Sequence, residues 1–115
     1  MQDFKQLDAW RRAHALTLAV YRETLMLPKE EVFGVTIQLR RVSTSIATRI
    51  AEGSGRSSNP EFAVDLRRAA ASCNELEYLI LLAHDLAYWK DEVADRLTDD
   101  TVNVRKLIYG LLRAM

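Results

Sequence analysis

The chain has 115 residues, of which 49% are apolar, and it carries 16 Lys or Arg against 16 Asp or Glu. This length suits a single domain over residues 1–115 and excludes a two-domain enzyme, while the zero net charge argues against strong attraction of the whole molecule to nucleic acid. The charge is uneven, because residues 1–58 hold nine basic and six acidic side chains. Charged residues interrupt the first twenty positions and no run of 18 apolar residues occurs, so we expect a soluble, cytoplasmic protein without a membrane partner.

Helical periodicity begins at Asp8, which suits an N-cap, and predicts a first helix over residues 8–26 that ends before Pro28. A second helix is predicted over residues 34–53. Its apolar residues recur at steps of three and four, namely Val35, Leu39, Val42, Ile46 and Ile50. The sequence Gly53-Ser54-Gly55 then predicts a glycine cap at the end of this helix.

The third predicted helix covers residues 60–88, with Asn59 as its N-cap and Pro60 at its first position. An apolar seam with alternating steps of four and three runs along it, formed by Phe62, Leu66, Ala69, Cys73, Leu76, Ile80, Ala83 and Ala87. A second apolar row exceeds what one core-facing stripe requires and predicts an oligomer interface, formed by Leu79, Leu82, Leu86 and Trp89.

The last predicted helix covers residues 91–114. A break near Thr98 is the alternative, because Asp99 and Asp100 interrupt its apolar pattern. Four helices with short connections predict an all-α fold, an antiparallel up-down-up-down four-helix bundle.

The sequence offers no recognisable catalytic machinery. Di-iron bundles carry inward Glu-x-x-His pairs, but Arg11 and Leu81 stand three positions before the two histidines. Cys73 lies on the apolar seam and is expected to be a buried, inert thiol. Gly53-Ser54-Gly55-Arg56 lacks the lysine of a phosphate-binding loop and is interpreted as a helix stop. We therefore expect no catalytic residue, no metal and no cofactor.

Polar residues share one face of the second helix, at spacings of three and four. We expect them to form a structural polar network with the third helix, and its members are Gln38, Arg41, Ser45, Glu52, Arg56, Ser72 and Glu75. In this network Arg41 would reach a carboxylate of the third helix, and Glu52 would meet Arg56 near the turn. The alternative is a ligand or RNA-phosphate site, with Arg40, Arg41, Arg49 and Arg56 as the nucleic-acid-binding residues.

Two stretches of the chain, LPKEEVFGVTIQLRRVSTSIATRIAEGSGR and EFAVDLRRAAASCNELEYLILLA, closely resemble the bacterial four-helix-bundle family encoded by open reading frames in the intervening sequences of 23S rRNA genes. The matching positions are Leu27-Pro28, Glu31, Gly34, Gln38 to Arg41, Ser45-Ile46, Ile50 to Gly53, Arg56, Glu61-Phe62, Ala70, Ser72 and Glu75 to Glu77. Two positions depart from the family pattern, since Arg49 replaces an Asn and Val42 replaces an Ala.

The resemblance implies an antiparallel helical bundle that assembles, in relatives, into a homopentameric barrel, and it implies no reaction. A distantly related accessory protein of diversity-generating retroelements works as a pentamer that contacts nucleic acid and a reverse transcriptase.

Three functions are open at this point. The first is a non-enzymatic, homo-oligomeric adaptor linked to RNA or another nucleic acid. The second is a protein-interaction module that acts through an apolar helix face and binds no nucleic acid. The third and weakest is a small-molecule or enzymatic pocket around Arg41, Glu52 and Glu75.

Overall fold

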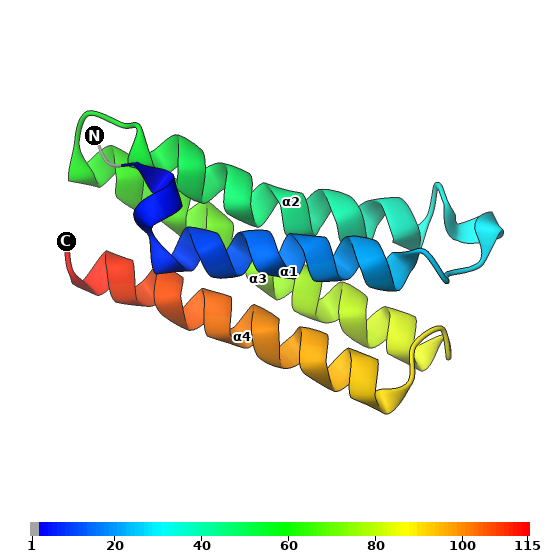
Figure 1. Cartoon of the computed structure of the whole chain (residues 1–115). Helices are drawn as coiled ribbons and strands as arrows, with labels where there is room; N and C mark the ends of the chain where they lie inside the picture. Colours follow the sequence, from blue (N-terminus) through cyan, green and yellow to red (C-terminus); the bar gives the residue numbers. More distant parts are fainter. Residues whose placement is uncertain (1–2) are drawn as a thin grey trace.

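The computed structural model describes residues 3–115, which form an elongated helical bundle of 43 × 23 × 20 Å (Figure 1). Its elements in chain order are the short 3-10 helix η1 (Phe4–Gln6), α1 (Asp8–Thr24), the 3-10 helix η2 (Lys29–Glu31), α2 (Val35–Ser54), α3 (Asn59–Asp85) and α4 (Asp91–Arg113). The four long helices differ from their predicted bounds by at most three residues at either end. In this part of the chain no helix is both long and apolar enough to cross a membrane.

Each long helix packs against two others, because α1 contacts α2 and α4 while α3 contacts α2 and α4. Neighbouring helices run antiparallel, as predicted for an up-down-up-down bundle (Figure 1). One end of the bundle therefore holds the start of α1, the α2–α3 turn and the end of α4. The other end holds the α1–α2 and α3–α4 connections.

The core consists of the inward residues of all four helices. The five apolar residues predicted to face inward on α2 are all buried, and so are seven of the eight residues of the predicted α3 seam. The eighth, Ala87, contradicts the prediction because it is exposed. The helix ends at Asp85, and Ala87 lies in the connection to α4 with a φ of 64°, a left-handed conformation that continues neither the helix nor its buried face.

Most of the second apolar row on α3 is used within the chain. Leu79 and Trp89 are buried in the core, and the Trp89 indole N–H donates to the Glu23 carbonyl at 2.9 Å. Leu82 is half-buried against the same core, and only Leu86, at 45% exposed, offers substantial surface. The predicted oligomer interface therefore does not fit Leu79 and Trp89, because the protomer itself covers both.

The helix ends correct several local expectations. Asp8 is the first residue of α1 and not its cap, and Ser58 rather than Asn59 caps α3, since its Oγ accepts from the Glu61 N–H at 3.4 Å. Gly55 ends α2 in a right-handed conformation, so this end does not use a left-handed glycine cap.

The alternative of a break near Thr98 is wrong and the continuous helix is confirmed, because α4 runs from Asp91 to Arg113. Its aspartates do not interrupt the buried face, which passes from Leu97 through Thr101 to Val104. Thr101 fits this buried position because its hydroxyl donates to the Leu97 carbonyl at 2.7 Å.

Candidate interaction surfaces

The structure brings together only part of the predicted polar network on α2. Ser45 Oγ lies 3.0 Å from Ser72 Oγ, which joins α2 to α3 by a hydrogen bond between half-buried serines. Four members are exposed, namely Gln38, Arg41, Glu52 and Glu75. The three charged ones among them take part in none of the ion pairs within residues 3–115. The expected pairing of Arg41 with a carboxylate of α3 is therefore wrong.

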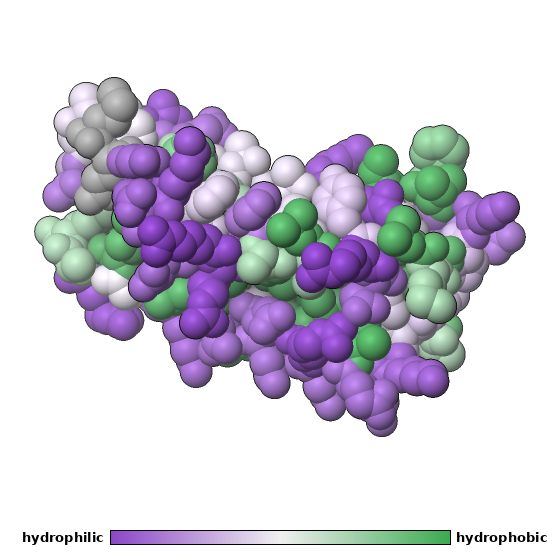
Figure 2. Space-filling model, viewed as in Figure 1, coloured by the Kyte–Doolittle hydropathy of each residue, from purple (hydrophilic) through white to green (hydrophobic). Residues whose placement is uncertain are grey.

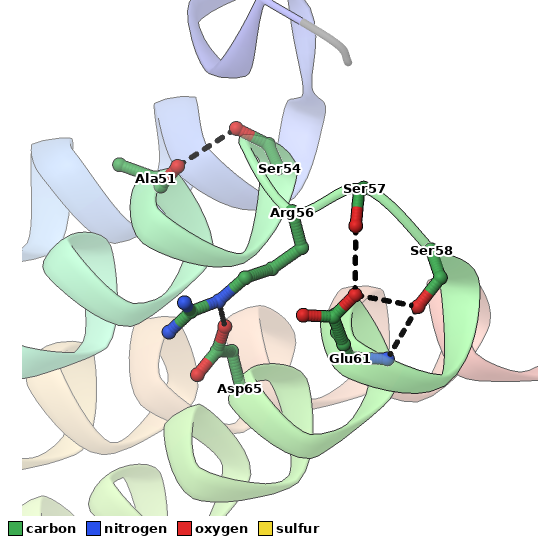
Figure 3. Close-up of polar contacts among 7 residues, drawn as sticks. All are labelled: Ala51, Ser54, Arg56, Ser57, Ser58, Glu61 and Asp65. Atoms are coloured by element: carbon green, nitrogen blue, oxygen red, sulfur yellow. Dashed lines mark hydrogen bonds and ion pairs between the residues drawn. The ribbon is translucent and has the colours of Figure 1, made fainter.

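Arg56 does reach α3, but its partner is Asp65 and not Glu52 (Figure 3). The Nε–H of Arg56 donates to Oδ2 of Asp65 at 2.8 Å, and Asp65 is only 4% exposed. This hydrogen bond and the negative charge of Asp65 raise the pKa of Arg56, with a smaller contribution from Glu52. The pair thereby attaches the segment that follows α2 to the first turns of α3.

Gly53 allows this approach of α2 to α3. A Cβ at Gly53 would lie 2.7 Å from the ring of Phe62 and 2.9 Å from Cβ of Asp65, which is closer than atoms can pack. The glycine is therefore required where the two helices meet, and no phosphate-binding role is needed to explain it.

The turn that follows is closed by Glu61, as Figure 3 shows. The hydroxyls of Ser57 and Ser58 both donate to Oε1 of Glu61 at 2.9 Å, while Ser58 Oγ accepts from the Glu61 N–H. The two hydroxyl hydrogen bonds lower the pKa of Glu61, that of Ser58 having the larger effect. This reciprocal arrangement resembles a capping box and starts α3.

The four candidate arginines do not form one cluster. Arg40 is tied to α1, because its Nε–H donates to Thr24 Oγ1 at 2.8 Å and its guanidinium lies 4.9 Å from the centre of the Tyr21 ring. Arg56 is paired with Asp65, which leaves Arg41 and Arg49, separated by about 12 Å along the helix axis. The small-molecule or enzymatic pocket considered around Arg41, Glu52 and Glu75 does not form either, because Arg41 and Glu52 lie about 16 Å apart along α2.

Neither the cysteine nor the histidines show catalytic geometry. Cys73 is fully buried, and desolvation raises the pKa of its thiol to about 12. His84 lies at the end of α3, where its Nε2 is 2.6 Å from Oδ1 of Asp91, and this hydrogen bond raises its pKa. Within residues 3–115, no three His, Cys, Asp or Glu side chains are placed to hold a metal ion.

The opposite end of the bundle is held by Glu31 and Tyr88. The Tyr88 hydroxyl donates to Oε2 of Glu31 at 2.6 Å, and Oε1 of the same carboxylate accepts from the Val35 N–H at 3.4 Å at the start of α2. A Cβ at Gly34 would come too close to the Glu31 carboxylate, so a larger residue there would have to displace this side chain. One side chain thus joins the α1–α2 connection to the α3–α4 connection.

The bundle has no net charge, but its positive and negative side chains are unequally distributed along its long axis. If each long helix is divided at its midpoint, the half that contains the α2–α3 turn (3–16, 45–72 and 103–115) holds ten Lys or Arg and five Asp or Glu. The other half (17–44 and 73–102) holds six Lys or Arg and eleven Asp or Glu. We call these the basic half and the acidic half, with formal side-chain charges of +5 and −5.

Large apolar side chains are exposed around the α1–α2 connection, and Figure 2 shows hydrophobic surface gathered at that end of the molecule. Leu25, Met26 and Phe33 are 75, 87 and 89% exposed. Together with four less exposed neighbours they form what we call the connector patch, which consists of Leu18, Tyr21, Leu25, Met26, Val32, Phe33 and Ile37. A concentration of this kind marks a contact surface more often than a solvated one.

The chain matches one family of known proteins over most of its length. The family model described as 23S rRNA-intervening sequence protein matches residues 5–110, which is nearly the whole chain. The chain belongs to the 23S rRNA-intervening sequence protein family. This confirms the resemblance seen in the sequence.

A solved structure from Bacteroides thetaiotaomicron, described as a protein with unknown function from the S23 ribosomal protein family, has the same fold. The two structures superpose with a TM-score of 0.84, and their sequences are 21% identical. The match covers 91% of this member of the 23S rRNA-intervening sequence protein family and 95% of the Bacteroides chain. No match is found among curated proteins.

Several positions that carry the resemblance to the 23S rRNA-intervening sequence protein family have structural duties here. Glu31 joins the two connections through Tyr88, Gly53 allows the close approach of α2 to α3, and Arg56 fixes it by pairing with Asp65. Arg49 is half-buried on α2 and takes part in none of the ion pairs within residues 3–115.

Two features were not found from the sequence of this family member. Asp65 was overlooked, although it follows Phe62 by three residues and so had to lie close to the buried face of α3. The connector patch was also missed, because its centre lies in an irregular segment where periodicity does not separate inward from outward residues.

Proposed function

We propose that this protein is a non-enzymatic adaptor that self-associates through the connector patch. The observation that carries the proposal is the exposure of Leu25, Met26 and Phe33, each at least 75% accessible in the protomer. Burying such side chains against a partner contributes about 1.5–3 kcal/mol each, so a contact over the patch can stabilise an assembly. Such an adaptor acts by binding through this surface, so it requires no catalytic side chain.

A second copy of the chain is the occupant favoured by charge. The connector patch lies in the acidic half of the bundle, which has a formal side-chain charge of −5. The basic half of another copy, with a charge of +5, supplies the complementary charge. The resemblance to the family also implies a homo-oligomer, with a pentamer as the expected form.

The test is the mass of the purified protein by light scattering at micromolar concentration. Met26→Ser combined with Phe33→Ser should lower the mass toward the monomer and leave the helical circular dichroism unchanged, because both side chains are exposed. Val64→Ser is the matched control, since Val64 is 45% exposed on α3 outside the patch. A wild-type protein that is monomeric under these conditions would contradict the proposal.

The charged ends favour a second function, in which the adaptor is linked to RNA or another nucleic acid through its basic half. Ten cations against five anions give this half an attraction for phosphate that the zero net charge of the whole chain conceals. The competing function is an adaptor for proteins alone. Fluorescence polarisation of labelled RNA at ~50 and ~200 mM salt separates the two, because phosphate contacts weaken steeply with salt. Absence of binding at the lower salt would leave only the protein adaptor.

A further inference from the structure

A surface depression lies between α1 and α4, in the basic half of the bundle. It has a volume of about 800 Å³, and its lining includes three cationic side chains, Arg12, Lys106 and Arg113. Apolar residues from both sides also line it, namely Leu7, just before α1, and Leu107 and Leu111 of α4. Lys106 and Arg113 are two helical turns apart on α4, so they are separated by about 10 Å along the groove.

The three cations are available to a ligand. All three are exposed, and within residues 3–115 none of them forms an ion pair with a carboxylate. The acidic residue in the lining, Asp8, already faces Arg11 at 3.7 Å. The groove therefore carries uncompensated positive charge beside an apolar surface.

Gly110 gives the groove a feature that the fold does not explain. Glycine is unfavourable within a helix compared with alanine, yet Gly110 lies in α4 with no positive φ. A Cβ there would meet nothing nearer than an Arg113 guanidinium nitrogen at 4.0 Å, so no neighbour requires the glycine. What the missing side chain provides is space in the lining of the groove. Gly53, by contrast, is accounted for by packing.

We infer that the α1–α4 groove binds the sugar-phosphate backbone of a single-stranded nucleic acid. The three cations would contact phosphates, while the leucines and the open surface at Gly110 would accept sugars and base faces. A volume of 800 Å³ falls in the range of about 300–1,000 Å³ that holds small ligands, and so suits a short stretch of single strand rather than a duplex. This inference rests on the nucleic-acid part of the proposed function and moves the contact away from the arginines of α2.

The test uses the full chain and a labelled single-stranded oligonucleotide of mixed sequence, as RNA and as DNA, with a duplex for comparison. Three phosphate contacts predict a slope of about −2 for log K against log salt, or roughly 20-fold weaker binding at ~200 mM than at ~50 mM salt. The groove variant is Arg12→Gln with Lys106→Gln. The matched control is Arg22→Gln with Lys90→Gln, which removes the same charge from exposed positions in the acidic half.

The groove variant should bind at least about 10-fold more weakly than wild type, with a slope reduced to about −0.7, while the control binds normally. Gly110→Gln should also weaken binding by filling the groove without a change of charge, with helicity preserved. Equal losses in the groove and control variants would overturn the inference, because they would indicate bulk charge alone. So would retained affinity in the groove variant with loss in Arg41→Gln/Arg49→Gln.

Two further results separate the inference from the proposed function. If wild type binds no oligonucleotide at ~50 mM salt, the nucleic-acid function itself fails and the inference fails with it. If the groove variant instead has a lower mass by light scattering and an unchanged affinity for the oligonucleotide, the groove is a contact between copies, and only the inference is overturned.

Discussion

Asp65 is 4% exposed and accepts a hydrogen bond at 2.8 Å from Arg56, whose own side chain remains 43% exposed. The two partners are therefore not equivalent. Loss of Arg56 leaves a carboxylate in the interior without its cation, whereas loss of the charge on Asp65 leaves a guanidinium that water can solvate.

From this asymmetry we expect Arg56→Ala to lower Tm by several degrees and Asp65→Asn to lower it less. Differential scanning calorimetry at neutral pH gives both values. An Arg56→Ala protein with the wild-type Tm would show that solvent reaches Asp65.

Gly53 offers a test of helix packing. We expect Gly53→Ala to destabilise the fold by about 1–3 kcal/mol, because the new methyl group would overlap Phe62 and Asp65 unless α2 and α3 move apart. Gly55→Ala is the control two residues later, where a Cβ meets only the Glu52 carbonyl at an ordinary 3.5 Å. Urea unfolding should place the control within about 0.5 kcal/mol of wild type. Similar losses at both glycines would point to the turn rather than to the close approach.

His84 predicts a dependence of stability on pH. Its pKa is raised in the folded protein by the hydrogen bond to Asp91, so the folded state binds a proton more tightly than the unfolded chain. The resulting stabilisation is complete below the ordinary pKa of 6.5 and is lost as pH rises through the raised value.

We therefore expect this contribution to the free energy of unfolding to decline above about pH 6.5, as measured by urea titrations across that range. Asp91→Asn should flatten the decline, whereas Asp99→Asn, at another exposed aspartate of α4, should preserve it. The same decline in all three proteins would assign it to other groups.

Cys73 should be unreactive in the native state. Desolvation raises the pKa of the thiol to about 12, so almost no thiolate exists near pH 8, and the side chain is fully buried. A chromogenic disulfide reagent should therefore modify it only at the rate at which the bundle opens, and rapidly in denaturant. Fast modification of the native protein would contradict the buried position on α3.

The sequence was sufficient for the helices and most of the core, because a period of three to four residues places Leu39, Ile46, Leu66 and Ile80 on inward faces whatever the connections do. The sequence did not predict the burial of Ala87 and Trp89 correctly, because the chain has left α3 there and helical periodicity no longer determines which side chains point inward. Trp89 packs into the core, and its buried indole N–H is satisfied by the Glu23 carbonyl, an acceptor 66 residues away that the sequence does not reveal.

The surfaces were harder to predict than the core. Arg40, Arg41 and Arg49 look like one cluster along the sequence, but a helix spreads them over more than ten ångströms and α1 occupies Arg40. The groove between α1 and α4 joins residues about a hundred positions apart, such as Arg12 and Lys106, and only the antiparallel arrangement brings them together.

The separation of charge along the 43 Å axis decides how this neutral protein presents itself to its surroundings. At physiological ionic strength the Debye length is about 8 Å, roughly a fifth of that axis, so the field of one end is screened well before it reaches the other. A charged molecule that approaches the α2–α3 turn therefore meets a net positive charge, and one that approaches the α1–α2 and α3–α4 connections meets a net negative charge. The isoelectric point of 6.7 describes neither encounter.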